Sequence, residues 1–124
     1  TEVSDKDFEQ VGALHLGKLR LDGFVSLDAD DHGTVTTRPF RANGGRLHAN
    51  VDASRGRLRA EVPDAETMEP PPGLSLADSQ PLTGDHLSGG LSWTGGDDVS
   101  SPRPVRIRFA LDRASLYAFW LEKA

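Results

Sequence analysis

Aspartates gather at two places in the chain, and they come nearest to a spacing that could do chemistry. Asp28, Asp30 and Asp31 share one short run, and Asp97 and Asp98 are adjacent. Hard oxygen ligands of this kind suit calcium, and two carboxylates flanking a sugar can hydrolyse a glycosidic bond. Both runs also have turn composition, in which carboxylates are usually solvated. The sequence therefore favours solvated turns, keeps calcium as the alternative, and gives an independent hydrolase the least support.

The sequence lacks the residues and motifs of the other common catalytic sites. The chain has no cysteine, which removes thiolate metal sites and a thiol nucleophile. Its four histidines form neither an HxxxH nor an HExxH pair, and no serine lies in a GxSxG turn. The glycine pairs after Ser88 and Thr94 have no lysine behind them, so they are typical of turns rather than of a phosphate loop. No catalytic residue and no cofactor are predicted, and the chain is not expected to be an enzyme.

Alternating apolar and polar residues define the elements that must position any site. The runs 47–51, 58–62 and 105–109 change character at every residue, which is typical of strands with one wet face. The predicted strands are 13–21, 23–29, 33–40, 46–52, 56–62, 88–93, 104–111 and 115–121. Turn residues at 54–56 and 112–114 predict tight hairpins, and hence antiparallel pairing.

About eight short strands without a βαβ pattern predict an all-β fold, an antiparallel β-sandwich resembling a jelly roll. We expect one module over residues 13–124, preceded by a lead-in at 1–12 whose residues 4–11 are compatible with a short helix. The stretch 63–87 contains Pro70-Pro71-Pro72-Gly73. It is expected to be a packed crossover or a functional rim loop.

The composition and net charge of the chain argue against some classes of binding partner. The 124 residues are 36% hydrophobic and 27% charged, and the net charge is −5. These values fit one globular domain, and the negative charge argues against nucleic acid and anionic membranes as partners. No apolar run approaches the ~20 residues of a membrane helix.

The polar strand faces are the most informative surface. His48, Asn50 and Asp52 alternate along one predicted strand, and Arg57, Arg59 and Glu61 alternate along the next. Such residues offer the donors and acceptors that sugar hydroxyls need, although a solvated, salt-bridged face explains them equally well. Trp93 has small and acidic neighbours, so we expect its ring to be partly exposed and able to stack on a sugar. On strand 115–121, residues 116, 118 and 120 are expected to share one face.

Several runs, in order, resemble the region near the C-terminus of bacterial putative glycoside hydrolases. They include Leu19-Arg20-Leu21-Asp22-Gly23-Phe24-Val25-Ser26-Leu27-Asp28-Ala29, Leu47-His48-Ala49-Asn50-Val51-Asp52-Ala53 and Pro104-Val105-Arg106-Ile107-Arg108-Phe109. The resemblance covers about residues 13–121. In that family the region is a β-sandwich module that follows a β-propeller catalytic domain, similar to those of glycoside hydrolase families 32 and 43.

The resemblance implies a non-catalytic module of a secreted or periplasmic enzyme, which binds carbohydrate, packs on the neighbouring catalytic domain, or does both. It carries no motif that fixes the binding residues. From the residue types we take the following as candidate carbohydrate-binding residues: Arg20, Asp22, Asp28, Asn50, Asp52, Trp93 and Arg108. A buried ion pair is an equally good explanation for Arg20 and Asp22.

Overall fold

The computed structural model describes residues 8–19 and 23–122, without the side chains of residues 8–13 and 18. Within them the chain forms six strands and one short 3-10 turn. The elements are β1 (Phe8–Leu19), β2 (Val25–Thr37), β3 (Asn43–Glu61), η1 (Leu76–Asp78), β4 (Leu82–Gly90), β5 (Asp98–Ser100) and β6 (Arg108–Glu122). No helix of the described residues is long and apolar enough to cross a membrane.

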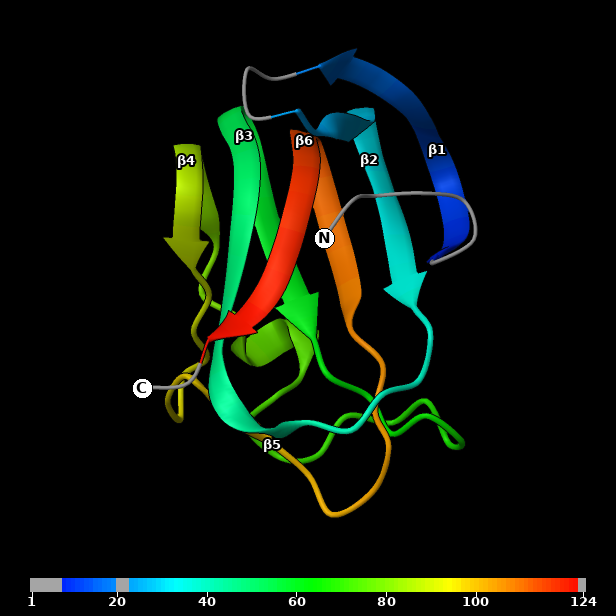
Figure 1. The fold of residues 1–124 in the computed structure, drawn as a ribbon, viewed down its shortest axis with the longest axis vertical. Helices are drawn as coiled ribbons and strands as arrows, with labels where there is room; N and C mark the ends of the chain where they lie inside the picture. The colour runs from blue at the N-terminus through cyan, green and yellow to red at the C-terminus, as the bar shows by residue number, and fades with distance from the viewer. Residues whose placement is uncertain (1–7, 20–22, 123–124) are drawn as a thin grey trace.

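The strands join into one antiparallel sheet in the order β1-β2-β6-β3-β4, and β5 pairs with the start of β3. The long strands bend near their midpoints, so each contributes to two layers that face each other (Figure 1). We call residues 25–29, 43–53 and 114–122 the front layer, and residues 33–37, 57–61 and 108–112 the back layer. The all-β antiparallel class is confirmed, whereas a sandwich of separate sheets is not established.

The core lies between the two layers. The strand β3 supplies Leu47, Ala49 and Val51 from the front layer and Leu58 and Ala60 from the back layer, all fully buried. Residues of β2 and β6 complete the same cluster, including Leu27, Val35, Phe109, Leu111 and Leu116. The period of two predicted from the sequence therefore describes the inward faces of both halves of each strand.

The tight hairpins predicted at 54–56 and 112–114 are wrong. Residues 46–52 and 56–62 belong essentially to one strand, β3, and residues 108–111 and 115–121 belong to β6. The pairings of β3 with β6 and of β2 with β6 shift register between Asp52 and Arg57 and between Ala29 and His32. Local turn residues thus mark a bulged bend that crosses three neighbouring strands, because bulges increase the bend and twist of a strand. The described sheet has six strands rather than about eight.

Two smaller expectations also change. Residues 8–11 form part of β1, so the lead-in helix is wrong for the described part, and residues 1–7 lie outside it. Residues 91–93, predicted as strand, follow β4, and only Trp93 makes isolated bridges. The segment 63–81 packs along the end of the sheet, where Val62 N donates to Leu74 O at 3.1 Å and Gln80 N donates to Ser92 O at 2.9 Å.

Candidate functional site

Three of the candidate residues share the outer side of the front layer. Asp28 and Asp52 lie on either side of Ser115, which is the register partner of both. Residues directly opposite in an antiparallel pair point to the same face. Asn50 is two positions along β3 from Asp52, on the same side of the strand, and it is buried at 3% exposure. The structure therefore brings Asp28, Asp52 and Asn50 to the same side of the sheet, but Asn50 is buried and the Asp28 side chain is only 13% exposed.

Trp93 is buried, which corrects the expectation of a partly exposed ring. Its side chain is 2% exposed, belongs to the core cluster, and donates from Nε1 to the carbonyl of Ala60 at 2.9 Å. Small and acidic neighbours in sequence did not reveal that the segment folds back over the sheet. Trp93 therefore belongs to the framework of the fold and not to its surface.

Arg108 lies on the opposite layer from Asp28 and Asp52. Its Nη1 donates to Glu61 Oε1 at 2.6 Å, and Glu61 Oε2 also accepts a hydrogen bond from Leu76 N at 3.3 Å. The pair joins β6 to β3 across the back layer. Arg20 and Asp22 lie outside the described residues.

The two polar runs of the sequence are likewise on opposite layers. His48 and Asp52 belong to the front half of β3, and Arg57 and Arg59 belong to its back half. The strand bends between them, so the pleat keeps both sets outward while carrying them to different sides of the core. The single polar face expected from two neighbouring strands is therefore two faces.

Trp120 is the surface aromatic that the sequence reasoning did not select. Asn50 and Val51 are consecutive in β3, but their register partners in β6 are Ala118 and Leu116, so β6 has one extra residue at this point. Leu116 and Phe119 consequently pack with the core, whereas Trp120 stands outside it, half-buried. Residues 116 and 120 thus do not share a face, because one extra residue in a strand reverses every side chain after it.

His48 stacks on the Trp120 ring and is fixed at both ring nitrogens. The two ring centroids are 5.9 Å apart and the planes differ by 8°. His48 Nδ1 lies 3.2 Å from Ser88 Oγ, and Nε2 lies 3.0 Å from Glu122 Oε2. These contacts come from β4 and β6, on the two sides of β3. Because both nitrogens have partners, the imidazole is held parallel to the indole.

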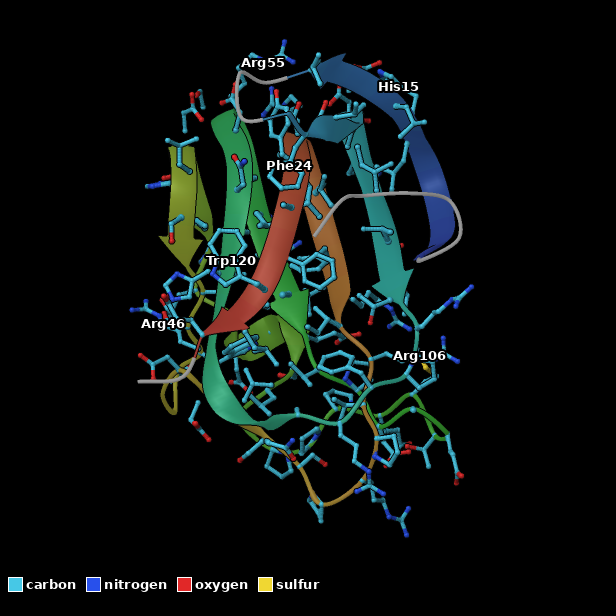
Figure 2. All side chains as sticks on the ribbon, in the orientation of Figure 1. His15, Phe24, Arg46, Arg55, Arg106 and Trp120 are labelled. Carbon is cyan, nitrogen blue, oxygen red and sulfur yellow. The ribbon has the colours of Figure 1, made fainter. Side chains whose placement is uncertain are left out.

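Arg46 extends this group along β3. It is the register partner of Glu122, and its Nε lies 3.3 Å from Leu91 O and 3.7 Å from Asp97 Oδ2. The guanidinium packs over Gly90, where an added Cβ would come within 2.5 Å of Arg46 Cζ. Figure 2 shows Arg46 and Trp120 near the same end of the front layer. We call Arg46, His48, Ser88, Trp120 and Glu122 the Trp120 cluster.

Trp120 also lines an apolar hollow of about 390 Å³. The hollow lies between the C-terminal part of β6 and the segment after β2, and its apolar walls include Pro39, Phe40, Phe119 and Leu121. The Trp120 cluster and this apolar hollow therefore adjoin the same C-terminal part of β6.

The aspartates of the two runs, 28–31 and 97–98, have protein partners. Ser26 Oγ donates to Asp28 Oδ1 at 2.5 Å, and His15 Nε2 lies 3.8 Å from Asp28 Oδ2. Asp98 Oδ1 accepts from Gly45 N at 3.0 Å. Among the described residues no three His, Asp or Glu side chains gather closely enough to hold a metal ion.

Comparisons of the chain with family models, with curated proteins and with solved structures returned no match. The likeness to modules of glycoside hydrolases stays a prediction from the sequence.

Proposed function

We propose that this chain is a non-catalytic carbohydrate-binding module, an accessory domain of a secreted or periplasmic glycoside hydrolase. The observation that carries the proposal is the Trp120 cluster: an indole on the outer surface of the sheet, beside an ordered imidazole and flanked by charged groups. The apolar face of a sugar ring packs on an aromatic ring, and its hydroxyls need donors and acceptors at the rim.

The chemistry of the cluster supports this ligand class. Arg46 supplies several N–H donors, Glu122 supplies carboxylate acceptors, and Ser88 supplies a hydroxyl that both donates and accepts. Their side chains lie on three strands of one sheet, so the backbone fixes their spacing before a ligand arrives. Such preorganisation reduces the conformational entropy lost on binding.

A second role, packing against a neighbouring catalytic domain, is favoured by a different observation. The hollow beside Trp120 is largely apolar, and a protein side chain such as leucine or phenylalanine would bury apolar surface there. Under this role the module would bind the catalytic domain and no free sugar. Tyr117 is 4% exposed and does not contribute to such a surface.

Ser88, His48 and Glu122 have the order of a nucleophile, a base and an orienting carboxylate. Acyl-transfer catalysis also needs a cleft and donors for an oxyanion. The apolar hollow of about 390 Å³ beside Trp120 is lined by neither Ser88 nor His48. The three groups are better explained as the contacts that orient the imidazole against Trp120.

The proposal is tested by screening the chain against a glycan array and titrating each hit by calorimetry. We expect saturable binding to at least one oligosaccharide. An absence of binding to every glycan, together with specific association with a β-propeller glycoside hydrolase domain, would establish the packing role instead.

A further inference from the structure

A second, polar hollow of about 360 Å³ lies where the long strands bend. Its walls come from four strands: Asp31 of β2, Gly56 and Arg57 of β3, Thr83 of β4, and Asp112 and Arg113 of β6. None of these residues belongs to the Trp120 cluster, so the hollow is a separate feature of the molecule.

The bend is held in an unusual backbone geometry. Arg113 has φ of 44°, in the left-handed region that non-glycine residues seldom adopt. A Cβ on Gly56 would lie 1.7 Å from the carbonyl oxygen of Asp112, so only glycine lets β3 and β6 approach this closely. Backbone strain of this kind persists only where the surrounding structure enforces it, and it is concentrated at functional sites.

The arginines at the bend differ in their pairing with carboxylates. Asp112 Oδ2 lies 2.9 Å from Arg57 Nε and 3.8 Å from Arg59 Nη2, so one carboxylate serves two guanidinium groups. Arg59 Nε is buried and has no hydrogen-bond partner among the described residues. Among the side chains that the structure describes, none of the carboxylates lies within ion-pair distance of Arg113. The hollow is lined by two arginines and two aspartates, so its formal charges balance, and Arg113 is the lining arginine that no described carboxylate pairs.

The remaining polar groups are suited to hydroxyls. Asp31 is highly exposed and lies 3.4 Å from His32 Nδ1, and Thr83 adds a hydroxyl on the opposite side of the hollow. An arginine with free N–H groups recognises a carboxylate through two parallel hydrogen bonds, while a carboxylate acceptor and a hydroxyl bind alcohols.

We propose that this hollow is a binding site for a hydroxy-carboxylate ligand, of which a hexuronic acid is one source and a free hydroxy acid another. Arg113 and Arg57 hold the ligand carboxylate, and Asp31 and Thr83 accept and donate to its hydroxyls. The site does not depend on the proposed role of the Trp120 cluster.

The test is calorimetric titration at low salt with D-glucuronate, D-gluconate, glucose and inorganic phosphate. We expect saturable binding of glucuronate, gluconate or both, and none of glucose, which lacks the carboxylate. Tighter binding of glucuronate would indicate a hexuronic acid as the ligand, and tighter binding of gluconate would indicate an open-chain hydroxy acid. Binding of phosphate as tight as that of either acid, or no saturable binding of either acid, would overturn the proposal.

Variants then locate the site. Arg113→Gly removes the guanidinium at a position whose φ suits glycine, so the fold is retained, and the affinity should fall about tenfold or more. Arg55→Ala removes the same charge from an exposed residue at the same end of the molecule that does not line the hollow (Figure 2), and it should change affinity by less than about twofold. Equal loss in both variants would show diffuse charge attraction and would contradict the assignment.

A third variant separates this site from the proposed sugar surface. Trp120→Ala should leave glucuronate and gluconate binding unchanged, because Trp120 does not line the hollow at the bend. Loss of acid binding in Trp120→Ala would place the ligand at the Trp120 cluster and would overturn the inference.

Discussion

At the scale of single residues, the two tryptophans have opposite roles. Trp93 fills the core and donates to Ala60 O, whereas Trp120 stands outside it with His48. The sequence predicted otherwise for both residues. The small neighbours of Trp93 indicated a partly exposed ring, and simple alternation placed Trp120 on the same face as Leu116. Burial by a distant segment and a one-residue bulge are long-range features, and local sequence patterns do not reveal them.

Replacing Trp93 should therefore affect stability and not binding. Trp93→Ala should lower the free energy of unfolding by about 3–5 kcal/mol, since it leaves a cavity in the core. Trp93→Phe keeps most of the ring and should cost about 1–3 kcal/mol, partly because the Ala60 carbonyl loses a buried donor. Urea denaturation measures both values. A change below about 0.5 kcal/mol in Trp93→Ala would mean that the residue is not packed as described.

At the scale of elements, the bend shared by β2, β3 and β6 determines the shape of the sheet. The polar and small residues at 54–56 and 112–114 do mark the place where the chain changes direction. From the sequence alone, however, they predicted hairpin turns rather than a bend within each strand. A bulge and a turn use the same residue types, and the difference depends on which strand pairs beside them. The alternation within each half-strand was sufficient to predict the core positions Leu47, Leu58 and Phe109.

The bend depends on Gly56. Gly56→Ala should lower the free energy of unfolding by about 2 kcal/mol or more, because the new methyl group would overlap Asp112 O and β3 would have to move away from β6. Gly95→Ala is the matched control, since nothing lies within 4 Å of its added Cβ. Thermal denaturation of the two variants compares them directly. Equal stability would contradict the close approach of the two strands.

The turn after β3 gives a pH-dependent prediction. Asp64 Oδ1 accepts hydrogen bonds from Glu66 N and Thr67 N, at 2.9 and 3.1 Å, and these backbone donors, with a smaller effect of Arg103, lower the pKa of the Asp64 carboxyl. A lowered pKa in the folded state means that the carboxylate stabilises the fold above its unfolded pKa of about 3.9. That stability is lost as the pH falls through the folded pKa.

Asp64→Asn keeps the shape of the side chain without its charge. The variant should be less stable than the wild type at neutral pH, and the difference should shrink as the pH falls below about 4. Chemical denaturation over a pH series measures this gap, and Glu69→Gln, in the same segment, is the control for general loss of negative charge. A gap that stays constant down to pH 2 would show that the Asp64 charge does not stabilise the turn.

At the scale of the whole molecule, the sheet presents two outer surfaces with different chemistry. The front layer presents the Trp120 cluster, and the back layer and the bend present paired arginines and aspartates. Composition and alternation were enough to predict an all-β antiparallel fold. They could not divide the polar residues between the two surfaces, because that division depends on where β3 and β6 bend.

The central claim is that the front surface binds carbohydrate through Trp120. Calorimetric titration of the best glycan from the array into wild type, Trp120→Ala and Leu87→Ala tests it most directly. Leu87 is exposed at 66% and controls for loss of surface apolar area. We expect Trp120→Ala to weaken binding by at least about tenfold, as for loss of a stacked aromatic contact, and Leu87→Ala to bind like the wild type. Wild-type affinity in a folded Trp120→Ala variant would contradict the claim.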